Sequence, residues 1–134
     1  MAQDYDDLSR SMLRGAIDMH IHSAPDIFPR SVTSVQAAEQ AREAGMDAIV
    51  LKSHSTDTAA RAELARDLTG MHVDGGVSLN YSVGGINPYA VLESARQGGR
   101  VVWFPTLCAR HFLAHAENVP ILREQSPLSS PGIV

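Results

Sequence analysis

The chain has 134 residues, of which 44% are hydrophobic and 19% are charged, and its formal net charge is -4. These values are typical of one ordinary globular domain. The negative charge and the lack of a Lys/Arg cluster argue against nucleic acid as a partner, because phosphate binding needs concentrated positive charge. We therefore expect a small-molecule partner.

The cysteine content and the start of the chain bear on location. Cys108 is the single cysteine and cannot form an intramolecular disulfide, and residues 1–14 are polar rather than signal-peptide-like. No apolar run approaches the roughly 20 residues that span a bilayer. These features predict a cytoplasmic protein without a membrane segment.

The first half of the chain reads as two strand–helix pairs. Residues 16–22 alternate apolar and polar side chains and predict a strand, and residues 35–44 are rich in helix formers and are followed by Gly45, a typical helix end. Residues 47–52 form an almost continuous apolar run, as expected for a parallel strand covered on both faces. A helix is expected over residues 58–68.

The pattern then repeats. We expect a strand at residues 73–79, a helix at 88–97 with proline in its first turn, a strand at 100–104, a short helix at 110–117 and a loop-like tail. The strand starts are spaced by roughly 25 to 30 residues, the length of one βα unit. The sequence therefore predicts an α/β fold with a parallel (βα)4 unit.

Four such units correspond to the N-terminal half of a TIM-type (β/α)8 barrel, which takes about 250 residues. We expect residues 1–134 to form a single partial domain. A fragment of a longer product is the favoured explanation, because the Ser/Pro-rich end resembles an interrupted loop. A half-barrel completed by a second copy and an open doubly wound sheet are the alternatives. The open strand edge predicts a homo-oligomer.

The first predicted strand carries the strongest chemical signal. Alternation places Asp18, His20 and His22 on one face, and two imidazoles separated by one residue stand about 7 Å apart at the backbone. Their ring nitrogens can converge on one ion. Neutral imidazole suits zinc, with manganese, iron or nickel as alternatives. The competing interpretation is a pair of histidines without a ligand.

Several runs of residues carry a family resemblance. The runs DMHIHSAPDIFPR, AGMDAIVLKSH, VGGINP and GGRVVWFPT resemble an uncharacterised amidohydrolase-type family within the amidohydrolase superfamily of metal-dependent hydrolases. The resemblance covers residues 16 to 115. It implies a metal held by His20 and His22 and hydrolysis of a C–N or C–O bond in a small molecule. The superfamily's other ligands come from strands 5, 6 and 8, which this chain does not reach.

Two residues at the end of the second strand add to this site. Lys52 and His54 continue the alternation of Val50 and are expected on the inward face. Lys52 is the catalytic candidate, with an ion-paired or solvated side chain as the alternative. His54 is a third candidate metal ligand, since this position resembles the polymerase and histidinol phosphatase (PHP) family. That resemblance implies phosphoester hydrolysis as an alternative function.

Substrate-binding candidates are Asp18, Asn80 and His111. Asn80 precedes a glycine-containing loop that leads into a helix N-terminus, where backbone N–H groups could hold an anion, although a tight turn also explains this loop. His111 and His115 are spaced i, i+4 and would share a helix face. The expected mechanism is attack by a metal-activated water. A truncated, non-catalytic metal-binding or interaction module is the remaining hypothesis.

Overall fold

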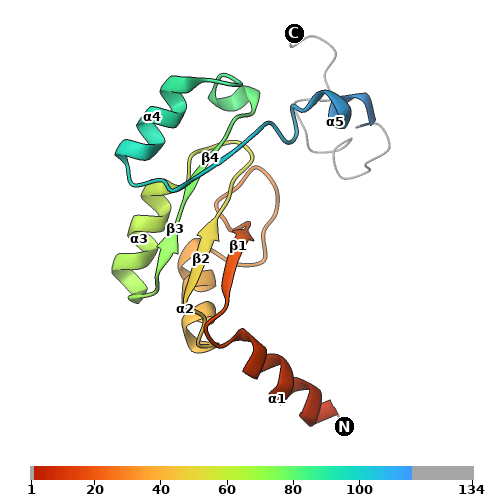
Figure 1. Ribbon diagram of the computed structural model, residues 1–134, viewed down its shortest axis with the longest axis vertical. Coiled ribbons are helices and arrows are strands. Elements are labelled where there is room, and N and C mark those ends of the chain that lie inside the picture. Colours follow the sequence, from red (N-terminus) through yellow and green to blue (C-terminus); the bar gives the residue numbers. More distant parts are fainter. Residues whose placement is uncertain (1, 116–134) are drawn as a thin grey trace.

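Short parallel strands alternate with helices in the computed structural model, which describes residues 2–115 (Figure 1). The predicted α/β class with parallel strands is confirmed, in two small sheets. In chain order the elements are α1 Ala2–Leu13, β1 Ile17–Ile21, α2 Ser34–Glu43, β2 Ala48–Leu51, α3 Ala59–Thr69, β3 Val73–Asp74, β4 Gly76–Ser78, the 3-10 turn η1 Tyr81–Val83, α4 Pro88–Arg96, β5 Val101–Trp103 and α5 Arg110–His115.

The two sheets follow the chain order. One sheet has the strand order β1-β2-β3, and the other pairs β4 with β5. All of these pairings are parallel. The carboxyl ends of the strands therefore face the same way within each sheet, and the loops after β1 and β2 lie at one end in Figure 1.

The polar start of the chain forms α1, a helix for which the sequence analysis had no prediction. In Figure 1 this helix projects away from the strands. Its apolar side chains Leu8 and Met12 are 56% and 73% exposed. The described side chains of this helix, residues 8–13, therefore add little to the core.

The core lies between the β1-β2-β3 sheet and the helices α2 and α3. Thr33 is the N-cap of helix α2. Its hydroxyl accepts a hydrogen bond from the backbone N–H of Gln36, and the Gln36 side chain accepts one from the Thr33 N–H. Small side chains let both helices approach the sheet closely. The buried cluster consists of Ala37, Ala38, Ala41, Ile49, Leu51, Ala62, Ala65, Met71 and Val73.

The side chains of β2 separate into two sets. Ile49 and Leu51 belong to the cluster under the helices. Because side chains alternate along a strand, Val50 and Lys52 lie on the opposite face. That face is the one on which the candidate functional residues meet.

The single strand expected at residues 73–79 is split into β3 and β4 at Gly75. A Cβ atom at Gly75 would lie 2.4 Å from the carbonyl oxygen of Thr58, so the strand passes directly against the start of α3. The Thr58 hydroxyl donates to the carbonyl oxygens of Leu51 and Gly76, at 2.7 and 3.0 Å, and accepts from the Gly76 N–H at 2.9 Å. Hydrogen bonds through the Thr58 side chain thus connect the end of β2 to β4, in place of direct backbone pairing between the two strands.

Within residues 2–115, no helix combines the length and the apolar character needed to cross a membrane.

Candidate metal centre

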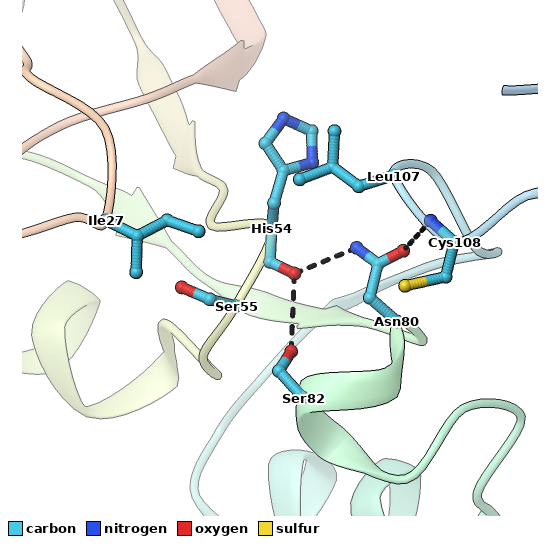
Figure 2. Close-up of a pocket in the computed structure, with 7 residues that line it drawn as sticks. All are labelled: Ile27, His54, Ser55, Asn80, Ser82, Leu107 and Cys108. Carbon is cyan, nitrogen blue, oxygen red and sulfur yellow. Dashed lines mark hydrogen bonds between the residues drawn. The ribbon is translucent and has the colours of Figure 1, made fainter. Parts of the chain in front are cut away.

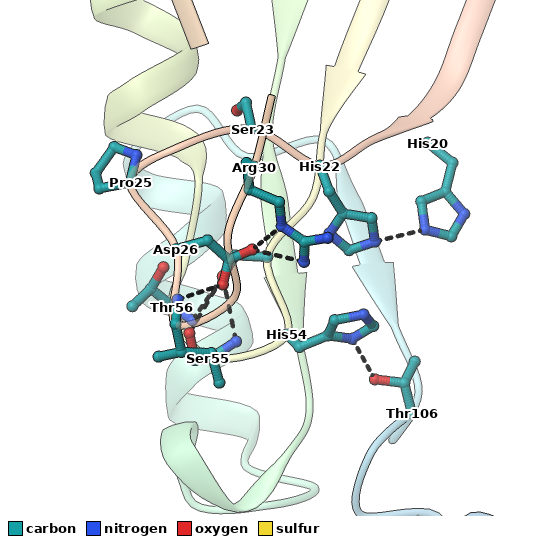
Figure 3. Close-up of polar contacts among 12 residues, drawn as sticks. His20, His22, Ser23, Pro25, Asp26, Arg30, His54, Ser55, Thr56 and Thr106 are labelled. Atoms are coloured by element: carbon teal, nitrogen blue, oxygen red, sulfur yellow. Dashed lines mark hydrogen bonds and ion pairs between the residues drawn. The ribbon is translucent and has the colours of Figure 1, made fainter. Parts of the chain in front are cut away.

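His20 and His22 bring their ring nitrogens together at the end of β1. Their Nε2 atoms are 3.0 Å apart and their ring centroids 5.0 Å apart (Figure 3). Since zinc binds imidazole nitrogen at about 2.0–2.1 Å, nitrogens at this separation can both contact one ion. The convergence expected from the H-x-H spacing is thus present, and the pair fits as two ligands of a metal.

His54 lies directly against this pair. Its ring stacks on that of His22, with centroids 4.6 Å apart and an angle of 26° between the planes. The Nδ1 atom of His54 forms a hydrogen bond of 2.8 Å with the hydroxyl of Thr106 (Figure 3). Among the described residues, however, no three His, Cys, Asp or Glu side chains are arranged to hold one ion. The described site therefore offers a pair of ligands with a third histidine beside it.

The imidazoles are kept in their neutral form. Burial, reinforced by neighbouring positive charge, lowers the pKa of His22 and of His54 to about 4. Burial also lowers the pKa of His20, where Lys52 adds to the effect and Asp18 opposes it. Neutral imidazole is the form that binds a metal.

One nitrogen of His22 lacks a partner. Its Nδ1 atom is buried and makes no hydrogen bond. A metal-binding histidine normally donates its second N–H to a carboxylate, a carbonyl or water. Within the described part of the chain, His22 Nδ1 has no such protein acceptor.

Asp18 stands beside the pair but on the exposed edge strand. Its Oδ1 atom accepts a hydrogen bond of 2.9 Å from the backbone N–H of His20. This bond fixes the carboxylate next to His20. The substrate-binding role of Asp18 stays a prediction.

An ion pair in the loop after β1 is a feature that the sequence analysis missed. The Oδ2 atom of Asp26 accepts hydrogen bonds of 2.8 Å from two nitrogens of Arg30, and the Asp26 side chain is fully buried. The Arg30 guanidinium lies 5.5 Å from the ring centroid of Phe28, and its charge contributes to the low pKa values of His22 and His54. The i, i+4 spacing of Asp26 and Arg30, each of which directly follows a proline, was the available signal.

Lys52 lies on the same face as the histidines and is only 5% exposed. Its Nζ atom is 5.1 Å from the ring centroid of Trp103 in β5, and burial lowers its pKa. Among the described residues, no hydrogen bond or ion pair engages this ammonium group. Its catalytic role stays a prediction.

The amide of Asn80 joins three loops. Its Nδ2 atom donates to the carbonyl oxygen of His54 at 2.8 Å and to the Thr106 hydroxyl at 2.9 Å. Its Oδ1 atom accepts from the backbone N–H groups of Thr106 and Cys108, at 2.9 and 3.1 Å (Figure 2). These bonds use the full hydrogen-bonding capacity of a side-chain amide. A substrate could bind this amide only by displacing one of them, so Asn80 acts as a positioning residue in the structure.

Asn80→Ala is expected to reduce the free energy of unfolding by about 3 kcal/mol, because buried groups of His54, Thr106 and Cys108 lose their partner. Urea denaturation measures the change. Ser82→Ala is the matched control, since the exposed Ser82 hydroxyl makes only a 3.5 Å contact with the same His54 oxygen; it should change stability by less than about 0.5 kcal/mol. Equal effects of the two variants would contradict the positioning role.

A small cavity opens beside His54 (Figure 2). Its volume is about 200 Å³ and its walls are almost wholly apolar. The lining residues are Ile27, His54, Ser55, Asn80, Ser82, Leu107 and Cys108. A dry cavity of about 150 Å³ holds a benzene-sized molecule. This cavity therefore has room for the body of a small ligand next to the histidines.

His111 is placed apart from these residues. It lies on α5 at the exposed surface, its ring centroid is 4.4 Å from that of His115, and its carbonyl oxygen lies 2.8 Å from the His115 Nδ1. The structure describes no contact between His111 and His20, His22 or His54. Its substrate-binding role stays a prediction.

Comparison with known proteins gives a family. Residues 15–130 match the model of a family described as a family of unknown function (DUF6282), so the chain belongs to that family. The match includes all of the candidate residues named above. Searches of curated proteins and of solved structures found no match.

Proposed function

We propose that this chain supplies the first part of the active site of a metal-dependent hydrolase of the amidohydrolase type. The observation that carries the proposal is the 3.0 Å separation of the His20 and His22 Nε2 atoms at the carboxyl end of β1. Active sites of β/α barrels lie at this end of the strands. In the structure the two imidazoles share a hydrogen bond, and the same convergence would let both nitrogens bind one ion.

The fold supports the finer proposal of a half-barrel. Parallel strands follow one another in chain order, and helices α2 and α3 cover the face opposite to the histidines. We propose that further strands, from a second copy of the chain or from another segment, pair with the exposed edges of β1 and β5 and bring the missing ligands. Exposed apolar side chains on these edges, Ile17, Met19 and Val102, favour such pairing. A homo-oligomer and a cytoplasmic location remain part of this proposal.

Each residue has a defined task in the proposed reaction. His20 and His22 hold the divalent ion, for which zinc is the first choice; when bound, such an ion acidifies water and polarises the bond to be broken. The cavity beside His54 binds the body of the substrate and keeps bulk water away from it. Asp18 is placed to accept a proton or a substrate hydrogen bond beside His20. The bond to be hydrolysed is a C–N or C–O bond in a small molecule.

Phosphoester hydrolysis of the PHP type is the second candidate. It is favoured by the stacking of His54 on His22, which brings a third imidazole to the same point. The Nδ1–H of His54 can donate to the Thr106 hydroxyl, which would direct its Nε2 lone pair to an ion. The non-catalytic module is the third candidate, supported by the absence of a third ligand among the described residues.

Calorimetric titration of the metal-free protein with zinc and with manganese tests the proposal. We expect saturable binding of one ion per chain and, in the loaded protein, hydrolysis of members of a panel of small lactones and cyclic amides. Binding of two or more ions with phosphatase turnover would support the PHP candidate instead. A protein that binds neither metal would contradict both enzyme proposals.

A further inference from the structure

Lys52 is the one cation near the histidines for which the structure describes no counter-charge. Arg30, the other cation whose charge acts on His22 and His54, is paired with Asp26. Lys52 is only 5% exposed, so little bulk water surrounds its side chain, and an anion entering this face would meet an ammonium group without a described counter-charge.

The backbone holds Lys52 in a fixed place next to the candidate metal ligands. Its N–H donates a hydrogen bond of 2.8 Å to the carbonyl oxygen of Ile21, the residue that precedes His22. The side chain extends over the ring of Trp103, so it spans the face between β2 and β5. Its charge contributes to the low pKa values of His20, His22 and His54, which places the ammonium group within electrostatic range of all of them.

We propose that the ammonium group of Lys52 binds a carboxylate group of the substrate beside the His20–His22 pair. That this carboxylate belongs to a substrate rests on the proposed function, whereas the presence of an anion site rests only on Lys52. A single positive charge balances a monoanion such as a carboxylate. A phosphate dianion would need further donors, and the guanidinium of Arg30, the nearest candidate, already binds Asp26.

The tryptophan under Lys52 provides a direct signal. Trp103 is the single tryptophan of the chain, so its fluorescence reports on the group above its ring. We expect acetate to change this fluorescence in a saturable way in the metal-free protein. Inorganic phosphate should bind at least about tenfold more weakly. Tighter binding of phosphate than of acetate would overturn the carboxylate assignment and favour the phosphoester candidate.

Lys52→Met removes the charge but keeps an apolar side chain of similar length. It should weaken acetate binding by at least about tenfold without weakening zinc binding, while Arg42→Gln, a change of an exposed cation on α2, should alter neither. Lys52→Arg keeps the charge and should retain acetate binding, which covers the case in which the methionine variant fails to fold. Equal acetate binding by wild type and Lys52→Met would overturn the proposal.

The two titrations separate the two proposals. Acetate binding without zinc binding would leave the Lys52 site standing and remove the hydrolase. Zinc binding without an acetate response would leave the metal site standing and remove the role of Lys52.

Discussion

Replacing His20 or His22 by alanine is expected to weaken zinc binding by at least about 100-fold. Loss of a residue that only orients a ligand already costs about 10- to 100-fold in metal affinity, so loss of a ligand from a site with two described ligands should cost more. His20 is exposed, and its substitution should leave the fold intact. Competition with a chromophoric chelator measures the affinity, and circular dichroism checks the fold.

Two other histidines serve as comparisons for this experiment. His72→Ala should not change zinc affinity, because His72 is exposed, precedes β3 at the opposite end of the strands and contacts Asp74. His54→Ala should have an intermediate effect if His54 only supports the pair. A loss as large as that of His22→Ala would make His54 a ligand. Unchanged zinc affinity in both His20→Ala and His22→Ala would contradict the metal site.

Gly76→Ala is expected to have the largest effect on stability, a loss of about 3 kcal/mol or more in the free energy of unfolding. A Cβ atom at this position would lie 1.8 Å from the carbonyl oxygen of Val101, the residue opposite Gly76 in the β4–β5 ladder. The two strands would have to separate. Because β5 leads to Thr106, the partner of His54, the site should be disturbed as well. The midpoint of urea denaturation measures the loss.

Gly70→Ala is the matched control for the effect of an added methyl group. Gly70 ends α3 with a φ of 70°, and no heavy atom lies within 4 Å of an added Cβ. Its substitution should therefore cost only the backbone strain of about 1 kcal/mol. Equal losses in the two variants would show that the close approach of β4 and β5 is not as described.

The regular elements were predictable because their signals are local. Apolar alternation and capping residues placed β1, β2 and the helices α2, α3 and α4 within a few residues of their observed bounds. The split of the third strand was not predictable, because it depends on contact between Gly75 and Thr58, which lie on different elements. The helical character of residues 2–13 was also missed, and the side chains of residues 8–13 in this helix are exposed.

For the site, residues close in sequence could be placed and residues far apart could not. The meeting of His20 and His22 follows from strand geometry alone. The contact of His54 with Thr106 joins residues 52 positions apart, and the fully bonded amide of Asn80 depends on the same loops. The lack of an ion pair between Lys52 and any carboxylate of residues 2–115 is likewise a property of the fold, which no spacing along the sequence shows.

X-ray absorption at the zinc edge of the zinc-loaded protein tests the central claim most directly. The account predicts imidazole nitrogens from His20 and His22 at about 2.0–2.1 Å from the ion, with the imidazole contribution reduced in His22→Ala. A sulfur neighbour at about 2.3 Å, which would come from Cys108 or a methionine, or an all-oxygen shell unchanged by the substitution, would contradict it.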